Sequence, residues 1–142
     1  MLQQEVDPTT QTLREFALSL VRHAPPSSLS RVAAGVLSVL ERQGPQRITI
    51  LAERESVSQP AMTGLVQRLE AADLVERRAD PADGRAALIV ITVPGLDALT
   101  ARRHSHDARL ASAIESLAAA DRAALEAALP ALTHLLESYE SA

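Results

Sequence analysis

Cysteine, lysine and tryptophan are absent from this chain of 142 residues, which has one phenylalanine and one tyrosine. The absence of cysteine excludes disulfides, thiol redox sensing and cysteine-ligated zinc. No stretch approaches the roughly 20 apolar residues of a membrane helix, and residues 1–10 lack the pattern of a signal peptide. We therefore expect a cytoplasmic protein with an aliphatic core, no membrane partner and no cofactor.

Catalytic and metal-binding motifs are also absent. The five glycines are scattered, so there is no glycine-rich phosphate loop, and no G-x-S-x-G nucleophile motif occurs. His104 and His106 are two residues apart on a predicted helix, where their side chains diverge by about 200° and do not easily share a metal ion. The sequence predicts neither an enzyme nor a metal protein.

Apolar residues at helical spacing predict two helices in the first third of the chain. One stripe covers residues 13–21, and the proline pair at 25–26 ends its helix. A second stripe covers residues 29–40 and follows Ser28 or Ser30, either of which can cap the helix.

The next segment predicts a helix-turn-helix. We expect Thr49 to cap a short helix around Leu51, and Ser58 to cap a second helix with Pro60 in its first turn. Two short helices with this connection have the spacing of a helix-turn-helix. The second helix turns four apolar residues inward: Met62, Leu65, Val66 and Leu69.

After Leu74 the spacing becomes strand-like, which predicts a β-hairpin. Residues 75–79 and 87–93 are the expected strands, and the turn sequence Asp-Pro-Ala-Asp-Gly at 80–84 lies between them. A β-hairpin attached to a helix-turn-helix is a wing.

Helical spacing returns at Pro94 and continues for more than twenty residues, although polar residues 102–107 interrupt its apolar stripe. A last helix is expected to be capped by Asp121 and kinked by Pro130. Terminal helices with apolar stripes that a small lobe cannot cover should pack against a second copy of the chain. The expected fold class is therefore mainly α with a small β-wing. Its expected parts are a flexible arm (1–8), a helical dimerisation region (9–27 and 94–142) and a winged helix-turn-helix lobe (28–93).

An ordered series of residues continues through the lobe, from Leu51-Ala52 through Val57-Ser58, Met62-Thr63, Leu65-Val66 and Leu69-Glu70 to Leu74-Val75-Glu76-Arg77. Its most specific part is D-P-x-D-x-R at residues 80–85, before a strand that ends in I-T-x-x-G at 91–95. This series resembles the MarR family of winged-helix regulators. The resemblance implies a homodimeric transcriptional regulator, here expected to be a repressor, that binds pseudo-palindromic double-stranded DNA and is released by a small-molecule effector.

The second helix of the helix-turn-helix is the expected recognition helix. Glutamine can pair with adenine, arginine with guanine, and threonine can contact a phosphate or a thymine methyl group. We expect Ser58 and the first N–H groups of the helix to contact a phosphate. Four residues on or beside the face opposite the buried stripe are expected to enter the major groove: Gln59, Thr63, Gln67 and Arg68. Pro60 and Gly64 on the same face should lie close to the DNA.

The wing adds Arg77, Arg78 and Arg85 to the expected DNA-binding residues. Arg85 near the hairpin tip suits a narrow, electronegative minor groove, and this matches the role that the resemblance implies for it. Asp83, two residues earlier, is expected to hold the Arg85 guanidinium in place. In the alternative interpretation the two residues form an ordinary surface ion pair that contributes little.

The charge of the lobe leaves a question about its binding partner. Residues 47–86 contain six arginines and seven acidic residues, which is a poor match to the negative DNA backbone. A second hypothesis is therefore a winged-helix dimer that binds another protein without binding DNA. An effector pocket is the other open question. The residues expected to line it are Phe16, Leu20, His23, Val36 and Leu40, and Arg14, Arg22 or Arg31 could bind an anionic effector. In the alternative interpretation these residues belong to the ordinary core or surface.

Overall fold

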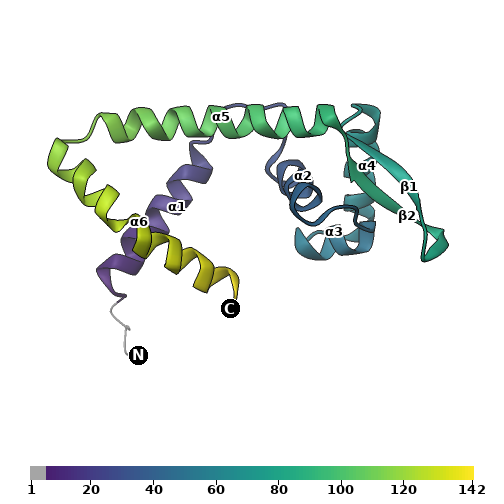
Figure 1. Cartoon of the computed structure of the whole chain (residues 1–142), viewed down its shortest axis with the longest axis horizontal. Helices are drawn as coiled ribbons and strands as arrows, with labels where there is room; N and C mark the ends of the chain where they lie inside the picture. Colours follow the sequence, from purple (N-terminus) through teal and green to yellow (C-terminus); the bar gives the residue numbers. More distant parts are fainter. Residues whose placement is uncertain (1–5) are drawn as a thin grey trace. The chain divides into compact units, whose positions relative to one another are not determined.

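The computed structural model describes residues 6–142, which form six helices and one two-stranded antiparallel sheet (Figure 1). The chain divides into two compact units, of which the first ends at Ser105 and the second runs from His106 to Ala142. The element order is a winged helix-turn-helix with helices on either side of it. The elements are α1 (Pro8–Arg22), α2 (Arg31–Gln43), α3 (Ile48–Arg54), α4 (Gln59–Ala71), β1 (Val75–Asp80), β2 (Asp83–Ile91), α5 (Val93–Glu115) and α6 (Ala119–Glu140).

The beginning of α1 lies within the segment predicted to be an arm. An oxygen of the Asp7 side chain accepts the backbone N–H of Thr10 at 3.1 Å, and Pro8 is the first helical residue. Asp7 and Pro8 are thus a helix cap and a helix start, and the prediction of an arm is wrong for them. Residues 1–5 of the predicted arm lie outside the described residues. The helix ends at Arg22, before the proline pair.

The lobe has one aliphatic core, to which α2, α3, α4 and the sheet contribute. The predicted inward stripe of α4 is confirmed, since Met62, Val66 and Leu69 are buried and Leu65 packs partly buried against the same core. Burying a side chain of this size stabilises the fold by about 1.5–3 kcal/mol relative to leaving it exposed. The largest fully buried side chains are Val36, Leu37, Leu40, Leu51, Met62, Val66 and Ile89.

Serine caps begin two of the lobe helices as predicted. The Ser30 hydroxyl oxygen accepts the N–H of Ala33 at 3.1 Å, which selects Ser30 over Ser28 as the cap of α2. The Ser58 hydroxyl oxygen accepts the N–H of Ala61 at 3.2 Å and caps α4. These bonds satisfy N–H groups that a helix start would otherwise leave without a partner.

Two other predicted caps are wrong. α3 follows Arg47 without a side-chain cap, and Thr49 lies inside it. The reason is that Gln46 exchanges two backbone hydrogen bonds with Ile89, at 2.8 and 3.1 Å, so the chain leaves this strand-like pairing directly into the helix. Near the C-terminus, α6 begins after Ala118, and Asp121 lies in the first turn of the helix. The negative charge of Asp121 still interacts favourably with the helix dipole there.

The wing consists of β1, β2 and the two residues between them. Both strands extend closer to the tip than predicted, so that Asp80, Asp83 and Gly84 belong to strands and Pro81 and Ala82 form the turn. The antiparallel register is regular from Val75 opposite Ile91 to Ala79 opposite Ala87. It then shifts, and Asp80 pairs with Asp83.

The motif T-x-x-G joins the wing to α5. The Thr92 hydroxyl donates to the Asp73 carbonyl at 2.5 Å, and its oxygen accepts the N–H of Gly95 at 3.1 Å. A Cβ atom on Gly95 would overlap the carbonyl oxygen of Leu74, so only glycine fits there without movement. Thr92 therefore caps α5 while Gly95 lets the helix approach the end of α4 closely.

α5 is continuous through polar residues 102–107, so these residues interrupt its apolar stripe and not the helix itself. Within the first unit, Arg103 donates to both carboxylate oxygens of Glu41 on α2, at 3.1 and 2.7 Å. This hydrogen bonding lowers the pKa of Glu41 below its usual range. The pair ties α5 to the lobe.

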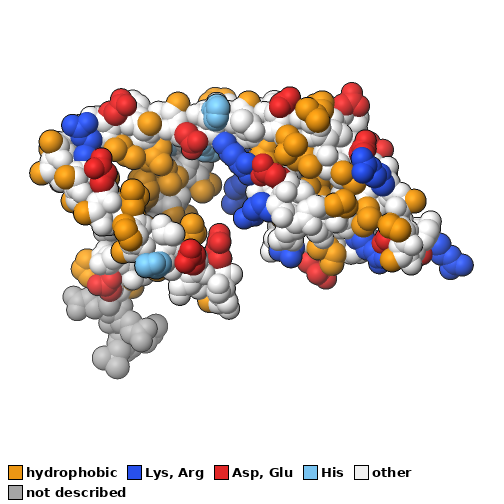
Figure 2. Space-filling view, in the orientation of Figure 1, with side chains coloured by type: hydrophobic (Ala, Val, Ile, Leu, Met, Phe, Trp, Pro, Cys, Tyr) orange, Lys and Arg blue, Asp and Glu red, His pale blue; other side chains and the backbone are white. Residues whose placement is uncertain are grey.

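α1 and α6 leave their apolar side chains open. Neither helix contains a buried residue, and hydrophobic side chains are visible on the surface (Figure 2). Pro130 lies inside α6, where its missing N–H removes one backbone hydrogen bond. No helix in the described part of the chain is long and apolar enough to span a membrane. The large exposed apolar residues on α6 are Leu125, Leu129, Leu132, Leu135, Leu136 and Tyr139.

Candidate nucleic-acid interface

α4 is held firmly at both ends and along its buried side. Ser58 caps its start, and its end is closed by Asp73, which has a left-handed backbone with φ of 59°. The N–H of Leu74 then reaches back to the carbonyl of Leu69 at 2.9 Å, the bond that typically closes a helix after a left-handed residue. The helix therefore presents its opposite face in a fixed orientation.

The outward face of α4 carries the residues predicted to read DNA. Gln59, Pro60, Gln67 and Arg68 are exposed, and Thr63 and Gly64 between them are half-buried. This mixture of amide, hydroxyl and guanidinium groups suits the edges of bases in a major groove.

Ser58 and Arg68 add detail to this face. The Ser58 oxygen is an acceptor in the cap, which leaves its hydroxyl hydrogen free to donate outward. A Cβ atom on Gly64 would lie 3.6 Å from an Nη atom of Arg68. The Arg68 guanidinium thus lies back along the helix over Gly64, within reach of the same surface.

Two of the three predicted wing arginines are paired with acidic residues. Arg77 on β1 donates from Nε to Glu70 on α4 at 2.8 Å. Arg78 lies 2.5 Å from the carboxylate of Glu76, two residues earlier on the same strand. Both pairs are partly exposed, so a phosphate could compete with the carboxylates for these arginines.

Arg85 is presented differently from the arrangement expected. Asp83 does not hold its guanidinium, because the Asp83 carboxylate accepts the backbone N–H of Arg85 at 3.1 Å. Asp83 therefore fixes the main chain at Arg85 and leaves the exposed side chain to extend. Figure 2 shows basic side chains at the free end of the wing.

Sequence reasoning missed one pair of the wing, Arg47 and Asp80. The Arg47 guanidinium donates twice to one oxygen of Asp80, which is almost completely buried. The backbone N–H of Ala82 and then the Arg47 guanidinium hold the pKa of Asp80 below its usual range. Because the two residues are 33 positions apart, only the first Asp of the wing signature could have pointed to such a partner.

These pairs change how the charge of residues 47–86 should be interpreted. Three of the six arginines, at positions 47, 77 and 78, are neutralised by acidic neighbours within the lobe. Arg54, Arg68 and Arg85 form no ion pair with any residue in the range 6–142 that the structure describes. The remaining three arginines face four acidic residues in this range, so pairing leaves its net charge unchanged. What favours DNA at α4 is the local distribution of charge, because residues 59–68 include Arg68 and no acidic residue.

The predicted effector pocket is not assembled within one chain. Val36 and Leu40 belong to the lobe core, whereas Phe16, Leu20 and His23 are exposed on or beside α1. The single chain therefore leaves the prediction of a pocket at these residues untested.

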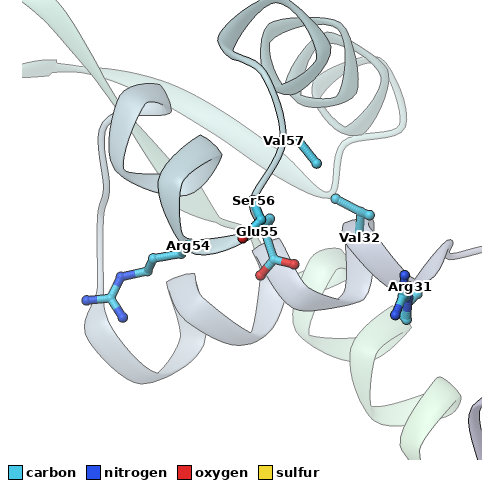
Figure 3. A pocket seen from close by; sticks show the side chains of 6 residues that line it. All are labelled: Arg31, Val32, Arg54, Glu55, Ser56 and Val57. Carbon is cyan, nitrogen blue, oxygen red and sulfur yellow. The ribbon is translucent and has the colours of Figure 1, made fainter. Parts of the chain in front are cut away.

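A pocket of about 480 Å³ lies instead between the start of α2 and the turn from α3 to α4 (Figure 3). Glu55 lies between Arg31 and Arg54 in this view, and its carboxylate rests against the backbone of Gly35. Burial raises the pKa of Glu55, and the nearby charge of Arg31 opposes this change. The pocket is lined by Arg31, Val32, Arg54, Glu55, Ser56 and Val57.

Comparison with known proteins covers most of the chain. A model of the MarR family matches residues 29–87. The chain is 30% identical over 112 residues to an HTH-type transcriptional regulator of Mycobacterium bovis, which covers 79% of this chain and 77% of the relative.

Solved structures agree with this assignment. A transcriptional regulator from Thermotoga maritima matches with a TM-score of 0.78 and 25% identity, over 95% of this chain and 98% of that chain. A mutant of Staphylococcus aureus MepR bound to an oligodeoxyribonucleotide shares the fold, with a TM-score of 0.67 and 18% identity over 92% of this chain and 99% of that one. The predicted fold class is thereby confirmed, and the chain belongs to the MarR family of winged-helix transcriptional regulators.

Proposed function

We propose that the protein is a homodimeric repressor that binds pseudo-palindromic double-stranded DNA through α4 and the wing. The observation that carries the proposal is the outward face of α4, which is rigidly mounted, polar and free of acidic residues from Gln59 to Arg68. Arg68 on this face and Arg85 on the wing have guanidinium groups that form no ion pair with a carboxylate of residues 6–142.

Each group has a distinct role in this proposal. Gln59, Thr63, Gln67 and Arg68 contact base edges in the major groove. The Ser58 hydroxyl and the first N–H groups of α4 contact a phosphate, which the helix dipole favours. Arg85 enters the adjacent minor groove, where the negative potential is largest when the groove is narrow.

The terminal helices support the dimer. Phe16 on α1 and Leu136 on α6 are 51% and 57% exposed in the single chain, and apolar faces of this extent are typical of surfaces that another protein covers. A second copy supplies the same stripes, so a two-fold contact can bury both sets at once. Two lobes related by this symmetry would then meet two half-sites of the DNA.

Other parts of the proposal rest on the family. The oligodeoxyribonucleotide bound to Staphylococcus aureus MepR supports DNA binding by this fold. A small-molecule effector would act by favouring a lobe spacing that does not match successive grooves. The protein would work in the cytoplasm, with its DNA, and would catalyse no reaction.

Selection of bound duplexes from a random library tests the proposal, followed by titration of two variants on the selected duplex. Arg68→Ala should relax the preference at one base pair per half-site, at a cost of about 1–3 kcal/mol there, if it reads a guanine. Arg85→Ala should weaken binding to all duplexes and reduce the slope of log K against log salt by about one unit. Arg42→Ala is the control, since it removes an exposed arginine from the last turn of α2, outside α4, the wing and the expected dimerisation region.

Failure to enrich any duplex would contradict the proposal. The alternative, a winged-helix dimer that binds a protein partner, would then become the better account. Equal losses in Arg42→Ala and Arg85→Ala would show that general charge, and not the wing, governs binding.

A further inference from the structure

The Arg47 side chain reaches from the start of α3 to the far end of β1. Its Nε and Nη2 atoms donate to one oxygen of Asp80 at 2.8 and 2.5 Å. The other oxygen of Asp80 accepts the backbone N–H of Ala82, in the wing turn, at 2.9 Å. Asp80 is 7% exposed and is the one buried residue with a polar or charged side chain in the part of the chain that the structure describes. Charge-assisted bonds to both oxygens hold a buried carboxylate in a defined position.

This contact lies farther out on the wing than the backbone attachment. The two hydrogen bonds between Gln46 and Ile89 join the base of the wing to the lobe. Arg77 is the residue opposite Ile89, and Asp80 is three residues beyond it, about 10 Å along the strand at ~3.3 Å per residue. Because an isolated two-stranded hairpin is marginally stable, the outer wing depends on a second attachment.

Asp80 also determines where Arg85 leaves the sheet. Asp80 pairs with Asp83, and the register shifts between Ala79 and Asp80 so that residues 84–86 have no partner on β1. Arg85 is the middle residue of these three, and its N–H is held by the Asp83 carboxylate. Movement of Asp80 would therefore move its pair Asp83 and, through it, the main chain at Arg85.

We infer that the Arg47–Asp80 pair is a positioning element for DNA binding, which fixes the outer wing relative to α4 so that Arg85 enters the minor groove. This inference rests on the proposed function, since it needs Arg85 to contact DNA. Neither residue touches DNA in this account. The donors around Asp80 lower its pKa, so the carboxylate remains charged and the pair persists at neutral pH.

Asp80→Asn tests the inference, with Glu53→Gln as its matched control. Both substitutions remove one negative charge from the lobe, which by itself should tighten binding to DNA. Glu53 is exposed on α3 and forms no ion pair with the described residues. The probe is a duplex that the wild-type protein selects from a random library, and affinity is read by fluorescence anisotropy.

Opposite effects are expected for the two substitutions. Asp80→Asn should weaken binding by up to about eightfold at 0.1 M salt, the factor that corresponds to one ion contact with a salt slope near 0.9. Glu53→Gln should bind as tightly as wild type or more tightly. If Asp80→Asn also bound as tightly as wild type while Arg85→Ala was weakened, the inference would be overturned and the proposed function would stand.

Arg47→Gln provides a second variant, in which the pair is broken but every residue of the wing is unchanged. The Arg47 side chain is 44% exposed, so the substitution leaves the core intact. In the DNA-free protein, amide hydrogen exchange at residues 80–88 should be faster in Arg47→Gln and in Asp80→Asn than in wild type. Unchanged exchange in both variants would overturn the inference whatever the affinity.

The two sites should also be coupled. In an Arg85→Ala background, Asp80→Asn should change the affinity by less than about twofold, because the contact that it positions is already gone. Equal losses in both backgrounds would show that the pair does not act through Arg85. If Arg85→Ala alone bound as tightly as wild type, the proposed wing contact would be wrong and this inference would fail with it.

Discussion

Gly95→Ala should destabilise the protein far more than a glycine-to-alanine change in a helix normally does. The added Cβ would overlap the Leu74 carbonyl oxygen and lie 2.9 Å from a side-chain carbon of Ile91. Non-bonded heavy atoms prefer separations of about 3.5–4.0 Å, and a backbone oxygen cannot swing away. Relief therefore requires the start of α5 to move from the end of α4.

That movement has a cost that can be worked out from the contacts at the junction. It weakens the hydrogen bond from the Thr92 N–H to the Leu74 carbonyl (3.1 Å) and that from the Thr92 hydroxyl to the Asp73 carbonyl (2.5 Å). Each such bond contributes about 0.5–1.5 kcal/mol, and overpacking costs about 1–3 kcal/mol. The higher helix propensity of alanine offsets about 1 kcal/mol of this cost. The net loss is about 3 kcal/mol, which lowers the unfolding midpoint by roughly 6–12 °C in a chain of this size.

Thermal unfolding at fixed protein concentration is the assay, with Gly35→Ala as the matched control. The three atoms nearest to a Cβ on Gly35 would be the two oxygens and the carbon of the Glu55 carboxylate, which is the far end of a flexible side chain and can move away. Gly35→Ala should therefore leave the midpoint unchanged or raise it by the helix propensity gain of about 1 kcal/mol. A Gly95→Ala variant as stable as Gly35→Ala would refute the close approach of α5 to α4.

Three further outcomes are expected. Asp73→Gly should raise the free energy of unfolding by about 0.5–1 kcal/mol, because glycine adopts the positive φ of 59° at this position without strain. The control Ala72→Gly, at a position with negative φ, should lower the free energy of unfolding. The pKa of Glu55 is raised in the folded protein above its ordinary value of 4.5. The protonated carboxyl group therefore stabilises the fold below pH 4.5, and this stabilisation is lost as the pH rises through the raised pKa. Glu55→Gln should therefore raise the unfolding midpoint at pH 7 and not at pH 4, and equal effects at both values would contradict the burial of the carboxylate. Leu132→Asp and Leu136→Asp should abolish the dimer in sedimentation and lower stability with it, and a folded, stable wild-type monomer at micromolar concentration would contradict the dimer.

The lobe could be predicted from the sequence because its elements have local causes. Ser58 caps α4 through a contact three residues away, and the spacing of Met62, Val66 and Leu69 determines which face is buried. Turn-forming residues placed the wing correctly, but they did not give the strand ends. Asp80, the last residue of β1, is bound by Arg47 at the start of α3, a contact with the lobe that a local pattern does not contain.

The predictions that proved wrong concern residues whose positions depend on long-range contacts or on a choice between side-chain and backbone partners. Thr49 is a good local cap, but the pairing of Gln46 with Ile89 determines where α3 begins. The expected side-chain contact between Asp83 and Arg85 is replaced by a backbone bond, a choice that the two residue types leave open. The Arg47–Asp80 pair joins segments that only the fold brings together.

The central claim is that α4 and the wing bind duplex DNA, and the salt dependence of binding tests it most directly. On a duplex selected by the wild-type protein, log K should fall linearly with log salt, with a slope of about −0.9 for each phosphate contact. A dimer making six to ten such contacts should lose roughly 10³–10⁵ in affinity between 50 and 200 mM salt. If no duplex is selected, or if the affinity for the selected duplex does not change with salt, the account of this protein as a DNA-binding regulator is contradicted.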